Sequence, residues 1–180
     1  MKPIGAMSQF ELAAYLQTQL RASGIDVILS GGASVAFYSN NKYLSADLDL
    51  VNAYFAKSSA IRGRMLALGF SEEGRYFIHP ETEFFVEFPP GPLAVGEEPV
   101  RTIEEHVLET GRLRIISPTD CVKDRLLGYF HWNDQQSLAQ AILVARMNPI
   151  DLQEIERWVE VEGKEEMYRA IQAQLLKGPK

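Results

Sequence analysis

The chain has 180 residues, of which 46% are hydrophobic, and a formal net charge of −6. This length supplies one well-formed core, or a core domain with a smaller helical appendage. The negative charge disfavours a protein that coats nucleic acid or anionic lipid, so we expect no broad DNA binding and no membrane partner. No apolar run approaches the roughly 20 residues that cross a bilayer. The single cysteine, Cys121, excludes an intrachain disulfide and suits a reducing compartment, so we expect a cytoplasmic protein.

The first two thirds of the chain mix helices with strands. Ser8 and Glu11 fit a capping box that begins an amphipathic helix, which ends at Gly24. The β-rich run at residues 25–29 predicts a buried strand. The elements that we expect next are a short helix at 33–38, a strand at 43–52, a helix at 58–68 and an antiparallel pair of strands at 75–79 and 83–88. Residues 89–99 form a loop that is too polar and rich in proline to pack. A hairpin follows at 100–107 and 112–116, although 103–108 equally fits a helical turn.

The last third is helical. Ser117 is a strong N-cap because Pro118 follows it at the first helical position and Asp120 lies in the first turn. We expect helices at 117–130, 134–148, 151–163 and 164–176. The prediction is an α+β fold in which residues 1–116 form a sheet-containing core and residues 117–180 form a helical subdomain packed on it.

Two carboxylates stand out in the strand at 43–52. Asp47 and Asp49 are two residues apart, so their side chains project from the same face of a strand. Adjacent anionic groups favour a divalent cation between them. Glu87 is a third candidate ligand because it interrupts an apolar strand, where an unpaired charge is costly to bury, and Glu83 is a reserve candidate on the same face. The alternative is that Asp47 and Asp49 form the solvated face of an edge strand.

A glycine turn precedes these acids. Gly31 and Gly32 permit a tight turn and a close backbone approach between the strand and the following helix. The backbone N–H groups of such a turn suit a phosphate, and Ser34 adds a hydroxyl in the first turn of the helix. A purely structural turn explains the two glycines equally well.

Several other side chains have two explanations each. Lys123 and Arg125 form either a phosphate site or the solvated face of a helix. His131 is either a general base or, more often for a histidine at a helix end, a cap or a satisfied buried group. Trp132 and Trp158 lie in apolar helical patterns, and we expect both in the core with Cys121.

The order of these motifs resembles a known superfamily. Ser30-Gly-Gly-Ala-Ser34, followed by Ser45-Ala-Asp-Leu-Asp-Leu50 and later by Glu87, is similar to the nucleotidyltransferase superfamily with the DNA-polymerase-β-type core. The segments at 117–126 and 131–134 are similar to the branch that includes the AbiEii-type toxins of abortive-infection toxin–antitoxin systems. The resemblance implies a twisted mixed sheet flanked by helices. It also implies Mg²⁺ or Mn²⁺, an NTP as nucleotide donor, an RNA, protein or small-molecule acceptor, and an antitoxin partner.

The resemblance also assigns roles to individual residues. Asp47, Asp49 and Glu87 match the catalytic metal ligands. The residues that match the nucleotide and phosphate contacts are Gly31, Gly32, Ser34 and Lys123.

The chain departs from the superfamily pattern at two places. Tyr43 stands four residues before the first acid, where members often have arginine. His131-Trp-Asn-Asp134 replaces the usual Arg-x-x-Asp stretch. These departures motivate a second hypothesis, a catalytically degenerate protein that keeps the fold and acts as an interaction partner. A third and weaker hypothesis is a hydrolase-type metal site without nucleotide transfer.

Overall fold

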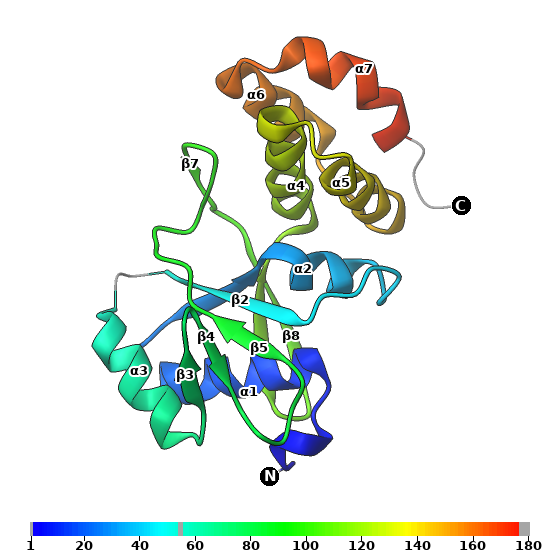
Figure 1. Ribbon diagram of the computed structural model, residues 1–180. Helices are drawn as coiled ribbons and strands as arrows, with labels where there is room; N and C mark the ends of the chain where they lie inside the picture. The colour runs from blue at the N-terminus through cyan, green and yellow to red at the C-terminus, as the bar shows by residue number, and fades with distance from the viewer. Residues whose placement is uncertain (1, 54–55, 177–180) are drawn as a thin grey trace.

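The computed structural model describes residues 2–53 and 56–176, with a short 3₁₀ helix at Ile4–Ala6 (Figure 1). The sheet-containing part consists, in chain order, of α1 (Gln9–Arg21), β1 (Val27–Ser30), α2 (Gly31–Tyr38), β2 (Asp47–Asn52), α3 (Ser58–Ala67), β3 (Ser71–Glu73), β4 (Tyr76–Ile78), β5 (Phe85–Glu87), β6 (Ala94–Val95), β7 (Glu98–Pro99), β8 (Ile103–Leu108) and β9 (Gly111–Ile116). The helical part consists of α4 (Pro118–Trp132), α5 (Gln135–Met147), α6 (Leu152–Glu162) and α7 (Glu165–Leu175). The predicted α+β class is therefore confirmed.

Local sequence signals set the helix ends. The Ser8 hydroxyl accepts a hydrogen bond from the backbone N–H of Glu11, whose side chain accepts one from the Ser8 N–H, which completes the capping box of α1. The Ser117 hydroxyl caps α4 through the N–H of Asp120. Gly163 ends α6 in the left-handed conformation, with a φ of 63°.

The large sheet is mixed, with the strand order β3-β4-β5-β2-β1-β9-β8. β2 pairs antiparallel with β1 and parallel with β5, and β1 pairs parallel with β9. β8 and β9 form the expected antiparallel hairpin, so the alternative of a helical turn at 103–108 is wrong. Because β2 lies inside the sheet, Asp47 and Asp49 are not on an edge strand, and that alternative is wrong as well.

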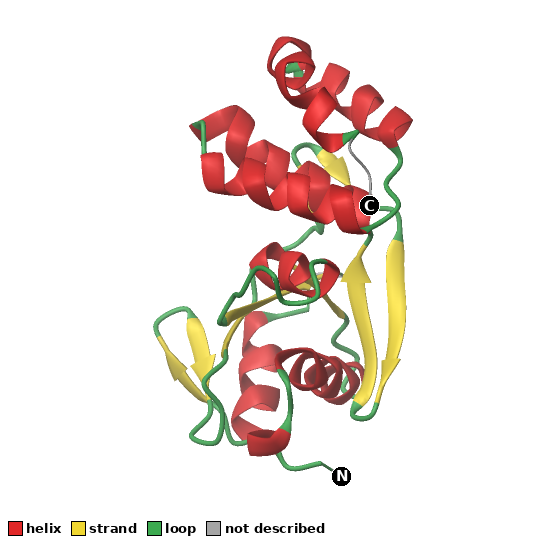
Figure 2. Cartoon of the chain, turned by 90° about the vertical axis from the view of Figure 1, so that its right-hand side faces the viewer, coloured by secondary structure: helices red, strands yellow, loops and turns green. Residues whose placement is uncertain are grey.

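Helices cover the sheet from different sides. In the view of Figure 1, α1 and α3 lie below β2, α2 lies above it, and α4–α7 stand above α2. Figure 2 shows the same order, with the long strands of the β8–β9 hairpin along one side. One continuous core joins these layers, from Leu16 of α1 through Leu29 of β1 and Leu48 of β2 to Leu126 of α4 and Trp158 of α6. The division at residue 116 stays a prediction, and residues 177–180 of the expected helical subdomain lie outside the described residues.

Three expectations need correction. β2 begins at Asp47 rather than at residue 43, and the short strand β3 was not expected. The segment at 89–99 packs, because it contains the β6–β7 hairpin and buries Val95, whose carbonyl oxygen accepts a hydrogen bond from Trp158 Nε1 at 3.3 Å. Trp158 is buried as expected, but Trp132 is 78% exposed because it lies on the outer face of the last turn of α4.

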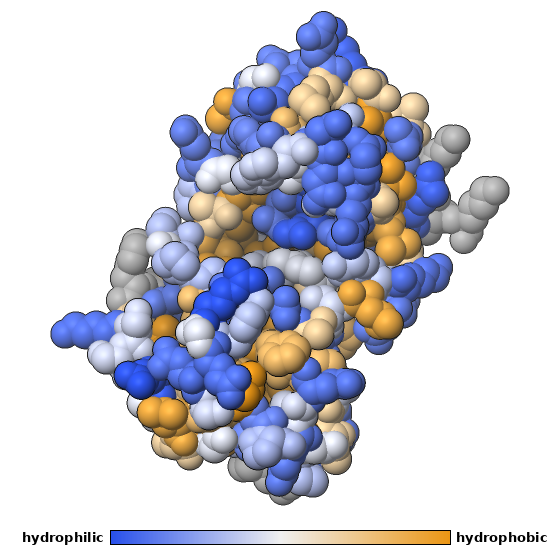
Figure 3. Space-filling model, viewed as in Figure 1, coloured by the Kyte–Doolittle hydropathy of each residue, from blue (hydrophilic) through white to orange (hydrophobic). Residues whose placement is uncertain are grey.

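The outer surface mixes polar and apolar residues. On the face shown in Figure 3, hydrophilic side chains dominate the helical part and apolar ones show between it and the sheet. Among the described residues, no helix has the length and apolar character to cross a membrane.

Candidate functional site

The site begins with the pairing of β2 and β5. Their parallel register places Asp47 beside Phe85 and Asp49 beside Glu87. Leu48 and Leu50 of β2 are fully buried on one face, so Asp47 and Asp49 share the opposite face, as the alternation of a strand requires. Paired residues in register present their side chains on the same face of a sheet, which brings the Glu87 carboxylate to the side of the two aspartates. Glu83 is exposed and precedes β5, so it lies outside this register.

Gly31 lies against the Asp49 carboxylate. It is the first residue of α2 and has a φ of +64°, a conformation that L side chains rarely adopt. A Cβ atom at this position would lie 1.8 Å from Asp49 Oδ2, so any side chain would displace the carboxylate. The antiparallel pairing of Ser30 with Asp49 produces this approach. The turn thus needs glycine both for its backbone conformation and for the acid beside it.

A cavity of about 350 Å³ opens where these elements meet. Asp49 and Gly31 lie on one wall, the prolines at 89–92 form a second, and Asp124 and Arg125 of α4 form a third. Arg125 is 21% exposed and is held by an ion pair with Asp124 and by a hydrogen bond from Nη1 to Gln140 Oε1 at 3.4 Å. The cavity therefore has a carboxylate, a helix N-terminus and a guanidinium on its walls.

The electrostatics of the site centre on Asp49. Burial, and then the negative charges of Glu87 and Asp47, raise the pKa of Asp49 to about 6, and Arg125 opposes this shift. Burial also acts on the Arg125 guanidinium, but the carboxylates of Asp124 and Asp49 leave its pKa raised. The site thus carries more negative charge than its own cations compensate.

Glu87 has a cation on its outer side. Its Oε2 atom lies 3.5 Å from Arg75 Nε, and this carboxylate is among the groups that raise the pKa of Arg75, after the hydrogen bond to Tyr76. With these side-chain positions, no group of three acidic, histidine or cysteine residues in the described chain lies close enough together to hold a metal ion.

The structure does not bring all the predicted phosphate contacts to this cavity. Gly31 lines it, while Gly32 packs beside Ser45, whose Oγ atom would lie 3.0 Å from a Cβ at that position. Ser34 is fully buried, and its hydroxyl donates to the Gly31 carbonyl oxygen at 2.7 Å and lies 3.2 Å from Cys121 Sγ. Its hydroxyl therefore supports the turn from inside.

Lys123 lies on another side of α4. Its Nζ atom is 3.0 Å from Asp120 Oδ1 and 3.1 Å from Glu154 Oε1, and the residue is only 5% exposed. It lines a different cavity, between α4, α6 and the β7–β8 connection. The cation at the Asp49 cavity is Arg125, not Lys123. Helical geometry is the signal that separates them, because residues two apart are turned by about 200° and cannot both face one cavity.

A second hollow adjoins the first. It has a volume of about 590 Å³, shares Asp124 and Arg125 with the Asp49 cavity, and continues along α4 to Trp132 and Asp134. His131 lies in its wall with Nε2 3.8 Å from Glu162 Oε2, so it faces an acid rather than the Asp49 carboxylate. Asp124 and Arg125 thus line both hollows, and Asp49 lines only the first.

Comparisons with known proteins bear on the fold. No protein-family model matches the sequence, and no curated protein matches it. Among solved structures, the chain is similar to an antigenic nucleotidyltransferase-like protein from Paracoccidioides brasiliensis, with a TM-score of 0.65 and 14% identity over 96% of this chain and 94% of that one. It is also similar to the antibiotic-resistance factor ANT(2'')-Ia in solution, with a TM-score of 0.51 and 14% identity over 89% and 91% of the two chains. The crystal structure of ANT(2'')-Ia in complex with adenylyl-2''-tobramycin matches with a TM-score of 0.51 and 13% identity over 87% and 94%. The chain therefore has a nucleotidyltransferase-like fold.

Proposed function

We propose that the protein is a metal-dependent nucleotidyltransferase. The observation that carries the proposal is the register of β2 and β5, which sets Asp49 beside Glu87 with the glycine turn at Gly31 against the same carboxylate. The oxygen donors of Asp47, Asp49 and Glu87 fit Mg²⁺ or Mn²⁺, both of which prefer carboxylate ligands. The raised pKa of Asp49, caused first by burial and then by the negative charges of Glu87 and Asp47, supports this fit because a divalent cation would stabilise the charged carboxylate.

Different groups of the chain would have different roles in the reaction. A bound divalent ion would neutralise charge on the triphosphate of an NTP and polarise its α-phosphate. The first N–H groups of α2 and the guanidinium of Arg125 would hold the phosphates, since both present positive charge to the cavity. The acceptor oxygen or nitrogen forms a bond to the α-phosphorus as the bond to pyrophosphate breaks, and Glu87 takes the acceptor's proton.

The hollow that shares Asp124 and Arg125 with the Asp49 cavity favours a small-molecule acceptor. It has the size of a ligand site and offers the exposed indole of Trp132 with the carboxylates of Asp124 and Asp134. An aromatic face and two acids suit a polar acceptor with hydroxyl and amino groups. ANT(2'')-Ia, whose fold is similar, is in a complex with adenylyl-2''-tobramycin. The other form of the proposal is that the acceptor is an RNA or a protein. In that form the chain is the toxin of a toxin–antitoxin pair and has an antitoxin partner.

The test measures whether a labelled nucleoside monophosphate is transferred from an NTP to an acceptor. The protein is incubated with NTPs labelled at the α-phosphate, Mg²⁺ or Mn²⁺, and in parallel total RNA, cell protein and polyamino alcohols. Transfer by the native chain, abolished by Asp49→Asn and retained by Glu73→Gln, supports the proposal. Glu73 is a matched control because it is an exposed acid on β3. Transfer that survives Asp49→Asn would contradict it.

A degenerate protein is the second candidate. The ion pair of Glu87 with Arg75 favours it, because this pair satisfies one proposed ligand without a metal. Calorimetry with Mn²⁺ and NTPs separates the candidates. Binding together with transfer supports the enzyme, and no binding of Mn²⁺ or any NTP supports the degenerate protein. Growth arrest on expression of the native chain but not of Asp49→Asn would favour the toxin form.

A further inference from the structure

A separate cavity lies at the other end of α2. Its volume is about 520 Å³, within the range of about 300–1,000 Å³ that is typical of small-molecule sites. None of its lining residues lines the Asp49 cavity. Gly31 at the start of α2 lines the Asp49 cavity and Phe37 near its end lines this one, and the rise of the helix between these two residues is about 9 Å.

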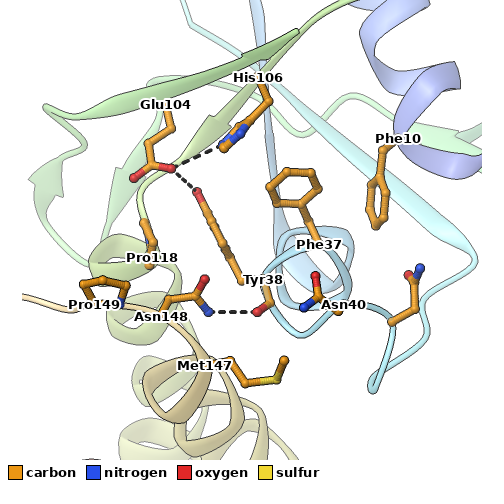
Figure 4. Close-up of a pocket in the computed structure, with 11 residues that line it drawn as sticks. Phe10, Phe37, Tyr38, Asn40, Glu104, His106, Pro118, Met147, Asn148 and Pro149 are labelled. Atoms are coloured by element: carbon orange, nitrogen blue, oxygen red, sulfur yellow. Dashed lines mark hydrogen bonds and ion pairs between the residues drawn. The ribbon is translucent and has the colours of Figure 1, made fainter. Parts of the chain in front are cut away.

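The walls combine aromatic faces with a carboxylate. Figure 4 shows Glu104 and His106 projecting from β8 toward the rings of Tyr38 and Phe37, with Phe10 beyond Phe37. The ring centroids of Phe37 and Phe10 are 5.1 Å apart, and those of Phe37 and His106 are 4.8 Å apart. The π faces of such rings attract cations.

Among the described residues, no lysine or arginine forms an ion pair with Glu104. Its Oε2 atom lies 3.3 Å from His106 Nε2 and 3.2 Å from the Tyr38 hydroxyl. The Tyr38 hydroxyl has one hydrogen to donate and lies closer to the carbonyl oxygen of Ile116, at 2.7 Å. Its hydrogen bond to the Glu104 carboxylate is therefore the weaker of the two. The contacts of Glu104 with His106 and Tyr38 are both made at Oε2, so among the described residues Glu104 Oε1 has no hydrogen-bond partner.

The remaining polar groups add acceptors and no positive charge. No described lysine or arginine lines the cavity, whose other polar side chains are three asparagines, Asn40, Asn41 and Asn148. The carboxyl end of α2 also faces it, where the backbone N–H groups of Asn40 and Asn41 and the side-chain amide of Asn148 donate to the last carbonyl oxygens of the helix.

We propose that this cavity binds a small organic cation, an amine or amidine carried on an aromatic or branched aliphatic body. The cationic group would lie against the Glu104 carboxylate, and the apolar body against Phe37 and Phe10. The site is independent of the proposed nucleotide chemistry, and its ligand requires no metal.

The test compares matched probes on the whole chain at about pH 8, where an ordinary histidine is neutral. Benzamidinium and 3-methylbutylammonium are titrated by calorimetry and by backbone-amide NMR, with the neutral benzamide as the control for shape. We expect the cations to bind about tenfold more tightly than benzamide, as a charge-assisted hydrogen bond to the carboxylate allows. The amide signals of Asn40, Asn41 and Asn148 should shift.

Two substitutions on one strand test the carboxylate. Glu104→Gln retains an acceptor for Tyr38 but removes the charge, and should weaken benzamidinium binding about tenfold. Glu105→Gln is the matched control, because Glu105 is 40% exposed against 37% for Glu104 but faces away from the cavity and pairs with Arg112. It should change the affinity less than about twofold. The proposal is overturned if neither cation binds at millimolar concentration, if benzamide binds as well, or if both variants weaken binding equally. Melting curves of both variants show whether each remains folded.

Discussion

Replacing Gly31 with alanine separates backbone strain from the contact with the Asp49 carboxylate. The left-handed conformation costs a non-glycine residue about 1–2 kcal/mol, and the smaller entropy of the unfolded alanine chain offsets about 0.4–1 kcal/mol of this. Gly24→Ala measures this net conformational cost without any steric contact, because Gly24 has a φ of +75° and no atom lies within 4 Å of a Cβ atom built there. We expect a loss of about 1 kcal/mol for Gly24→Ala.

Gly31→Ala should cost more. Its Cβ would lie 1.8 Å from Asp49 Oδ2 and 2.8 Å from Cγ, so the carboxylate must move by more than an ångström. Forcing a half-buried side chain off its position adds about 1–3 kcal/mol, for a total of about 2–4 kcal/mol. A chain of this size loses about 2–4 °C of melting temperature for each kcal/mol.

A double-mutant cycle measures the contact itself. The free energy of unfolding is determined in urea for Gly31→Ala in the native chain and in an Asp49→Ala background, where Oδ2 is absent. The cost of Gly31→Ala should fall by about 1–2 kcal/mol in that background. Equal costs in both backgrounds, or a cost no greater than that of Gly24→Ala, would refute the close approach of the glycine turn to Asp49.

Three further outcomes follow from the described contacts. The pKa of Asp49 is raised to about 6, so protonation of this carboxyl stabilises the metal-free fold as the pH falls from 6 toward 4. Over that range the unfolding free energy of the native chain should rise by about 1–3 kcal/mol relative to that of Asp49→Asn. A difference between the two proteins that does not change with pH would contradict this. Lys123→Met should destabilise the chain by about 2–4 kcal/mol in urea titrations, because it leaves the buried Asp120 carboxylate without its cation, whereas Glu154 keeps its pair with Arg157. It should spare nucleotide affinity at the Asp49 cavity. Trp132→Ala should change the melting temperature by less than about 2 °C since the indole is exposed, whereas a large drop would show that it packs.

Local signals in the sequence determined most of the elements. The capping box at Ser8 and the proline after Ser117 act through atoms a few residues away, so the starts of α1 and α4 follow from the sequence alone. The same holds for Asp47 and Asp49, whose shared face is a property of any strand. The α+β class followed from the mixture of these elements, and the fold of the solved structures agrees with it.

Strand neighbours and the rotation of helices were decided only in the tertiary structure. The order of strands places β2 between β1 and β5, and their register sets Asp49 beside Glu87, a pairing between residues 38 positions apart that no local pattern specifies. The choice of Arg125 over Lys123 at the cavity depends on which face of α4 buries against α6, where Lys123 meets Glu154. These features arise because packing is a property of surfaces that meet only after the chain has folded.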